Sequence, residues 1–108
     1  MMAGFVTVAT IDELKPGDEP IVVEIGRRWV AVFNVDGEYY AIEDLCTHDD
    51  GPLAEGELHG YVIECPRHGA TFDLQTGKAL TAPAYVSVPT YEVRVNGNEI
   101  QVGGRKKT

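Results

Sequence analysis

The stretch that decides this fold is CTHDDGPLAEGELHGYVIECPRHGATF, residues 46–72. It contains two similar segments, CTH at residues 46–48 and CPRHG at residues 65–69, each with one cysteine and one histidine. Glycine and proline accompany both segments and let the backbone bend back sharply. Two finger-like loops of this kind are able to converge. We therefore expect one binding site, whose members are Cys46, His48, Cys65 and His68.

Two thiolates and two neutral imidazoles suit borderline-soft metals, which makes Zn²⁺ and an iron–sulfur cluster the candidates. Zinc fingers usually pair cysteine with cysteine and histidine with histidine. Here each segment carries one of each, so the two cysteines are able to hold one iron and the two histidines another. The pattern favours a cluster, and zinc remains the alternative. A nucleophilic cysteine is disfavoured because the Cys/His pairing occurs twice.

Outside these loops, short β-type runs alternate with turn residues. We predict strands at residues 5–8, 20–25, 29–35, 38–42, 61–64, 71–74, 91–95 and 99–102, with residues 46–60 as a loop. Asp36-Gly37 and Asn96-Gly97-Asn98 are strong hairpin signals. A capping-box pattern at residues 10–13 predicts one helical turn. Many short strands at this spacing indicate an all-β fold, an antiparallel sandwich or barrel.

The two metal-binding segments resemble the two halves of the Rieske motif. The downstream pairs at residues 72–73 and 76–77 also resemble the strand and turn that follow it, and the resemblance extends to about Val102. It implies an antiparallel Rieske-type β-sandwich with a small cluster-binding subdomain of two loops, at about residues 45–53 and 64–72. It further implies a [2Fe–2S] cluster whose inner iron is held by Cys46 and Cys65, and whose outer iron is held by His48 and His68.

Departures from the motif indicate which type of Rieske protein this chain resembles. Respiratory Rieske proteins carry two further cysteines, and a Ser and a Tyr that donate hydrogen bonds to the cluster. This chain has no third cysteine and has Ala70 and Phe72 at those positions. With fewer donors to stabilise the reduced cluster, we predict a potential at the low end of the Rieske range, roughly −150 mV. The pattern is similar to that of the soluble ferredoxins of ring-hydroxylating dioxygenases.

The chain is not expected to be the oxygenase itself. A terminal oxygenase adds a mononuclear iron on two histidines and one carboxylate. Once the cluster ligands are assigned, only His59 remains, and we interpret it as a polar turn residue. We therefore expect an electron-transfer protein rather than an enzyme. Its partners would be a flavin-containing reductase and a terminal oxygenase.

Composition sets further limits. The 108 residues, 44% apolar, suit a single domain over residues 1–108, with a disordered tail at residues 103–108. A net charge of −8 disfavours nucleic acid as a partner and favours a basic protein surface. No run is long enough to cross a membrane and no signal peptide is evident, so we expect a cytoplasmic protein.

Two classes of function remain open from the sequence. The first is a ferredoxin that carries single electrons between a flavoprotein and an oxygenase. The second is an accessory module, either a cluster-bearing subunit for nitrite reduction or cluster assembly, or a zinc-stabilised binding domain. A red-brown, redox-active protein would favour the first class over the zinc module.

Overall fold

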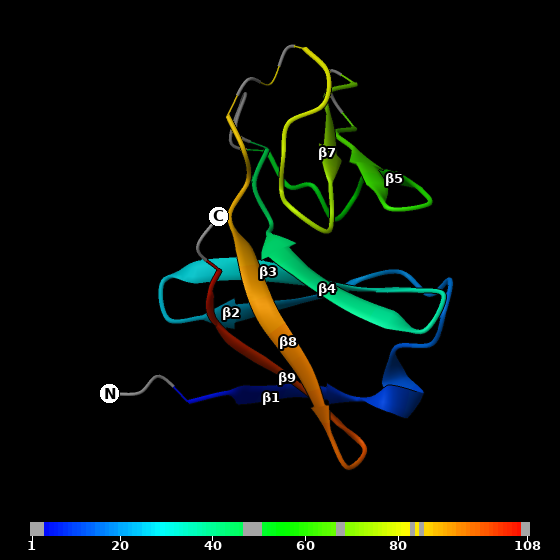
Figure 1. The fold of residues 1–108 in the computed structure, drawn as a ribbon, viewed down its shortest axis with the longest axis vertical. Coiled ribbons are helices and arrows are strands. Elements are labelled where there is room, and N and C mark those ends of the chain that lie inside the picture. Colours follow the sequence, from blue (N-terminus) through cyan, green and yellow to red (C-terminus); the bar gives the residue numbers. More distant parts are fainter. Residues whose placement is uncertain (1–3, 47–50, 67–68, 83, 85, 107–108) are drawn as a thin grey trace.

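The computed structural model describes residues 4–46, 51–66, 69–82, 84 and 86–106, and in them the chain forms two antiparallel sheets (Figure 1). The larger sheet, which we call the base, has the strand order β1-β9-β8-β4-β3-β2. Its members are β1 (Val6–Thr10), β2 (Ile21–Ile25), β3 (Arg28–Val35), β4 (Glu38–Glu43), β8 (Thr90–Asn96) and β9 (Glu99–Arg105). A single 3₁₀ turn, η1 (Ile11–Glu13), follows β1.

The smaller sheet lies at one end of the molecule's long axis, above the base in Figure 1. It has the order β5-β6-β7, with β5 (Glu57–His59), β6 (Val62–Glu64) and β7 (Thr71–Asp73). Together with the connections around it, over residues 44–88, it forms what we call the small subdomain. The expected all-β antiparallel architecture is confirmed.

The base folds over on itself into a sandwich. Its two edge strands, β1 and β2, stand at opposite ends of the strand order. Nevertheless, Ala9 of β1 and Val23 of β2 pack in one apolar cluster with Val32 of β3 and Ile100 of β9. The sheet must therefore curl until its two halves face each other, which is how an antiparallel sheet buries one face without a second sheet.

Strand β3 joins the base to the small subdomain because both of its faces are buried. Val30 and Val32 point into the base. Ala31 and Phe33 point the other way, into the apolar cluster of the small subdomain. This explains why residues 29–35 read as a nearly continuous apolar run rather than an alternating one.

Local signals set the turns as expected. Asp36 and Gly37 both have positive φ, 54° and 93°, as the tight β3–β4 hairpin requires. The Gly37 N–H also donates to Oδ1 of buried Asn34 at 2.8 Å. At the start of η1, the Thr10 N–H donates to Oε1 of Glu13 at 2.8 Å, so the predicted helical turn is confirmed.

Two expectations were wrong in part. Residues 57–59, predicted as loop, form β5, because they pair with β6 over the register Glu57↔Glu64 to His59↔Val62. The tail was expected to be disordered from residue 103, but β9 continues to Arg105, and the Lys106 N–H donates to the Thr90 carbonyl at 2.8 Å. Residues 107–108 lie outside the described residues. In the part of the chain that the structure describes, no helix is long and apolar enough to cross a membrane.

Candidate metal centre

The two cysteines stand at equivalent places in two loops. Cys46 follows β4 and Cys65 follows β6, and their relative exposures are 0% and 1%. The Cys46 N–H donates to the Gly51 carbonyl and the Cys65 N–H donates to the Ala70 carbonyl, each at 2.6 Å. Each cysteine thus closes its own loop onto the residue five positions later. The repeated closure is the structural counterpart of the repeated Cys/His pairing in the sequence.

The first loop is anchored by Asp44, a residue that the sequence analysis did not single out. Its N–H donates to the Trp29 carbonyl of β3 at 2.8 Å. Its carboxylate accepts the Ala54 N–H at 2.7 Å and so joins the two ends of the loop. An aspartate that directly follows a strand is a common turn-forming residue, and this was the signal available in the sequence.

The second loop depends on glycine at two positions. Gly69 has φ +77°, a conformation that L side chains rarely adopt, and its N–H donates to the Cys65 carbonyl at 3.1 Å. Gly56 lies so close to the Glu64 carbonyl that a Cβ at residue 56 would overlap it. The turn before β5 therefore packs directly on the backbone that leads into Cys65.

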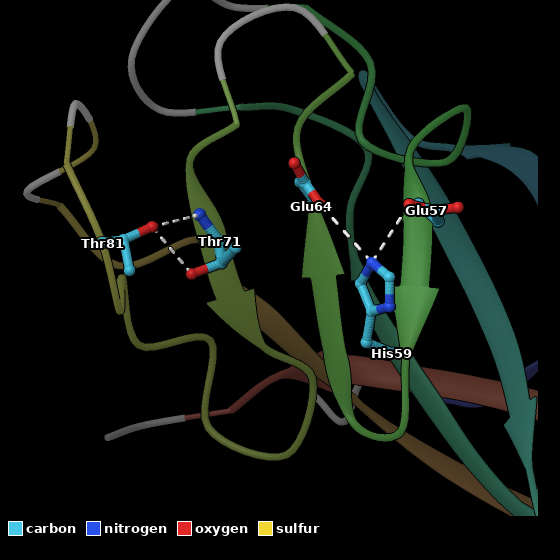
Figure 2. Close-up of polar contacts among 5 residues, drawn as sticks. All are labelled: Glu57, His59, Glu64, Thr71 and Thr81. Carbon is cyan, nitrogen blue, oxygen red and sulfur yellow. Dashed lines mark hydrogen bonds and ion pairs between the residues drawn. The ribbon is translucent and has the colours of Figure 1, made fainter.

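A third connection is fixed beside the second loop by a pair of threonines. The Thr81 hydroxyl accepts the Thr71 N–H at 3.1 Å and lies 2.9 Å from the Thr71 hydroxyl (Figure 2). The Leu80 N–H also donates to the Thr71 carbonyl at 2.8 Å. These contacts hold residues 80–81 against β7, the strand that follows the CPRHG segment in the sequence.

The surroundings of the cysteines are apolar. Both belong to one buried cluster that also contains Leu53, Ala70 and Phe72. Neither Ala70 nor Phe72 carries a side-chain donor. A pocket of about 280 Å³ opens beside Cys65 and is bordered by Pro66 and Gly69, together with acidic side chains of β5 and β6. Two cysteines buried in one apolar cluster, with open space beside Cys65, fit the sulfur-rich half of a metal centre.

The structure brings together only part of the predicted ligand set. Cys46 and Cys65 lie in the same buried cluster. His48 and His68 lie outside the described residues. His59 is not a turn residue, as the sequence analysis proposed, but a member of β5. Its imidazole lies among carboxylates on the outer face of the small sheet.

A larger cavity, of about 640 Å³, lies between β2 and the turn before β5. Val22, Phe33 and Leu58 give it an apolar floor, and Asp18 and Glu55 are at its border. Neither cysteine borders this cavity. Its size therefore does not make it the metal centre, and the chemistry of the donor atoms points to the smaller pocket beside Cys65.

A polar cluster stabilises the end of β4 just before Cys46. Nη1 of Arg28 lies 2.8 Å from Oε1 of Glu43, and the Tyr91 hydroxyl donates to the same oxygen at 3.4 Å. Burial, and then the negative charge of Glu43, raise the pKa of Tyr91 above its usual value. Tyr91 therefore remains a neutral donor at ordinary pH, and the carboxylate that ends β4 keeps both partners.

Comparison with known proteins agrees with this geometry. The family model for the Rieske [2Fe-2S] domain matches residues 4–92. The chain belongs to the Rieske [2Fe–2S] family. Ferredoxin CarAc of Metapseudomonas resinovorans is 40% identical over 100 residues, which cover 93% of this chain and 94% of the relative. The biphenyl dioxygenase ferredoxin subunit of Pseudomonas sp. (strain KKS102) is 38% identical over 91% of this chain and 90% of the relative.

A solved structure of the complex of reduced oxygenase and oxidized ferredoxin in carbazole 1,9a-dioxygenase contains a similar chain. Its TM-score is 0.88 at 38% identity, and the match covers 96% of both chains. This Rieske protein is thus an electron carrier rather than an enzyme, and its cofactor is a Rieske-type [2Fe–2S] cluster. The alternative considered from the sequence, a zinc-stabilised module, is therefore replaced by a protein that holds a [2Fe–2S] cluster.

Proposed function

We propose that this Rieske protein passes single electrons from a flavin-containing reductase to a terminal ring-hydroxylating oxygenase, with the cluster held by Cys46, His48, Cys65 and His68. The observation that carries the ligand set is the pair of buried cysteines, each closing its loop by the same 2.6 Å backbone hydrogen bond. Two loops built alike, each with a histidine two or three residues after its cysteine, suit one shared centre.

In this assignment the buried cysteines and the histidines would bind different iron atoms. Cys46 and Cys65, in the apolar cluster, would hold the inner iron, and His48 and His68 would hold the outer iron. The bound cluster supplies a site that accepts and releases one electron. Loops at about residues 45–53 and 64–72 would surround it, and Leu53, fully buried in the same apolar cluster as both cysteines, would help to exclude water. Neutral imidazoles in place of two thiolates lower the negative charge of the centre and favour its reduction.

The partners are proposed from charge and from the relatives. A formal net charge of −8 suits docking on a basic protein surface, because complementary charge accelerates encounter. One relative is a biphenyl dioxygenase ferredoxin subunit, and one structural neighbour was solved in a complex with its oxygenase. We place the protein in the cytoplasm, where two cysteines kept for metal ligation are the normal arrangement.

The ligand set is tested by electron paramagnetic resonance of the dithionite-reduced protein. We expect a red-brown protein with a rhombic signal of low average g, and pulsed measurements should detect two coordinated imidazole nitrogens. His48→Asn and His68→Asn should each remove one nitrogen coupling or the whole cluster. His59→Asn is the matched control and should retain both couplings. A loss of coupling in His59→Asn, with both couplings kept in the other two variants, would refute the assignment.

The carrier role is tested by reconstitution. Purified flavoprotein reductase, this protein and a terminal oxygenase should together turn over an aromatic substrate. Omission of this protein should stop electron delivery. The rate should fall as salt rises from about 0.05 to 0.5 M, because exposed charges are screened over about 10 Å at 0.1 M. A protein that is reduced by the flavoprotein but delivers no electrons to any oxygenase tried would contradict the proposed acceptor while leaving the cluster intact.

A further inference from the structure

Three potential metal-binding side chains lie together on the outer face of the small sheet, and two of them, Glu57 and Glu64, border the pocket that opens beside Cys65. Glu57 and His59 are two positions apart on β5, so their side chains point to the same face. Glu64 of β6 is directly opposite Glu57 in the strand register and shares that face. Figure 2 shows the imidazole of His59 between the two carboxylates, which come from neighbouring strands.

The distances resemble the spacing of ligands around a single ion. Nε2 of His59 lies 3.2 Å from Oε1 of Glu57 and 3.4 Å from Oε1 of Glu64. One donor atom from each of the three side chains lies within 4.8 Å of the other two. Two ligands about 2.1 Å from a tetrahedral Zn²⁺ are separated by roughly 3.4 Å, so the imidazole is already at ligand spacing from both carboxylates.

The strand register adds an independent argument. Glu57 and Glu64 form a directly opposed cross-strand pair, and like charges in that position destabilise a sheet. The two strands share only three residue pairs, so few other cross-strand pairs accompany this one. A cation between the carboxylates would convert this repulsion into attraction. Among the described residues in contact with the pair, only His59 is able to carry positive charge, and its ring nitrogen is also a good transition-metal ligand.

We propose that Glu57, His59 and Glu64 bind one divalent first-row transition-metal ion, with Zn²⁺ as the ion that best suits the donor set. One imidazole nitrogen and two carboxylate oxygens form an open site, in which water completes the coordination. The side chains are exposed by 75%, 56% and 39%, so the ion enters directly from solvent. The bound ion would clamp β5 to β6, the strand that leads into Cys65. None of the proposed cluster ligands takes part, so failure of this site would leave the proposed function untouched.

The test uses the cluster-loaded protein, so that the cysteines are already occupied. Calorimetric titration with ZnCl₂ should show saturable uptake of one Zn²⁺ per chain, checked by metal analysis after dialysis alongside iron content. His59→Ala and Glu57→Gln should weaken binding at least about tenfold, since loss of even an outer-shell partner costs 10–100-fold in metal affinity. Affinity should also fall as pH is lowered, because protons and the ion compete for the same nitrogen.

Glu55→Gln is the matched control, because Glu55 is exposed, close in sequence and of the same charge, but is not one of the three donors. It should change the affinity less than twofold. Zn²⁺ should also raise the thermal midpoint of the parent protein and of Glu55→Gln, but not that of His59→Ala. The proposal is overturned if Glu55→Gln weakens binding as much as Glu57→Gln, if His59→Ala keeps the parent affinity, or if the parent takes up no stoichiometric Zn²⁺.

Discussion

The base and the small subdomain are both antiparallel, but they are built on different scales. Strands of the base are five to eight residues long, and tight hairpins join β2 to β3, β3 to β4 and β8 to β9. The β3–β4 register is continuous over six residue pairs. Strands of the small subdomain are three residues long. Their positions depend on single contacts, such as the Asp44–Ala54 hydrogen bond and the packing of Gly56 on the Glu64 carbonyl.

This difference shows how the protein separates stability from chemistry. The base buries its own apolar cluster, which contains no cysteine. The small subdomain buries a second cluster that contains both cysteines, and β3 supplies Ala31 and Phe33 as its floor. Short strands alone are marginal in water, so the metal loops must rest on a scaffold that is stable without them. Perturbing the two regions separately should therefore affect stability and cluster retention differently.

The largest expected effect comes from a matched pair of cavity-forming substitutions. Ile63 of the small subdomain and Ile100 of the base are both fully buried. Truncation of either to alanine should cost about 2–5 kcal/mol of unfolding free energy, measured by urea denaturation. Only Ile63→Ala should also accelerate loss of the [2Fe–2S] cluster under native conditions. The reason is that Ile63 packs in the same group of buried apolar residues as the cysteines. Cluster loss is followed by bleaching of the visible absorbance.

The comparison fails if Ile100→Ala bleaches as fast as Ile63→Ala at equal loss of stability. That result would mean that the cluster leaves only through global unfolding, and that the small subdomain has no separate opening equilibrium. Faster bleaching in Ile63→Ala alone would identify local opening of the small subdomain as the route of loss.

A second prediction concerns the single contacts of the small subdomain. Gly56→Ala places a methyl group against the Glu64 carbonyl, so the backbone must shift next to Cys65. We expect a loss of about 1–3 kcal/mol in stability and a lower iron content per chain. Gly104→Ala is the control, since a Cβ at residue 104 of β9 meets nothing within 4 Å. Iron content unchanged in Gly56→Ala would show that the turn before β5 does not position the second loop.

The same contrast explains what the sequence was able to predict. The base strands were recognised because their apolar patterns and the Asp36-Gly37 turn are local signals. β5 was missed because residues 57–59, with the sequence ELH, have little strand propensity, and only pairing with β6 makes them a strand. The cysteines were singled out by their spacing, and the structure buries both in one apolar cluster, while their role as ligands stays a prediction. Asp44 directly follows a strand, which indicates a turn but not its partner. The backbone groups that Asp44 and Gly56 contact lie ten and eight residues away, and no local pattern specifies those contacts.

The smallest expected effect is a change in reduction potential when a polar group is added near the cysteines. Ala70 is fully buried, and its carbonyl accepts the Cys65 N–H. Ala70→Ser would add a hydroxyl donor at this position. If it donates to the more negative reduced state, a net gain of about 1.4 kcal/mol would raise the reduction potential by roughly 60 mV, from a parent value predicted near −150 mV. Protein-film voltammetry measures both values.

Ala31→Ser supplies the control from the floor of the same buried cluster, because Ala31 is also fully buried but lies on β3. It should cost about 1–3 kcal/mol of stability if its hydroxyl finds no partner, and it should leave the potential unchanged. An equal rise in both variants would mean that the reduction potential depends on the general polarity around the [2Fe–2S] cluster. A rise in Ala70→Ser alone would show that a single donor in the second loop sets it, and that alanine at this position keeps the potential low.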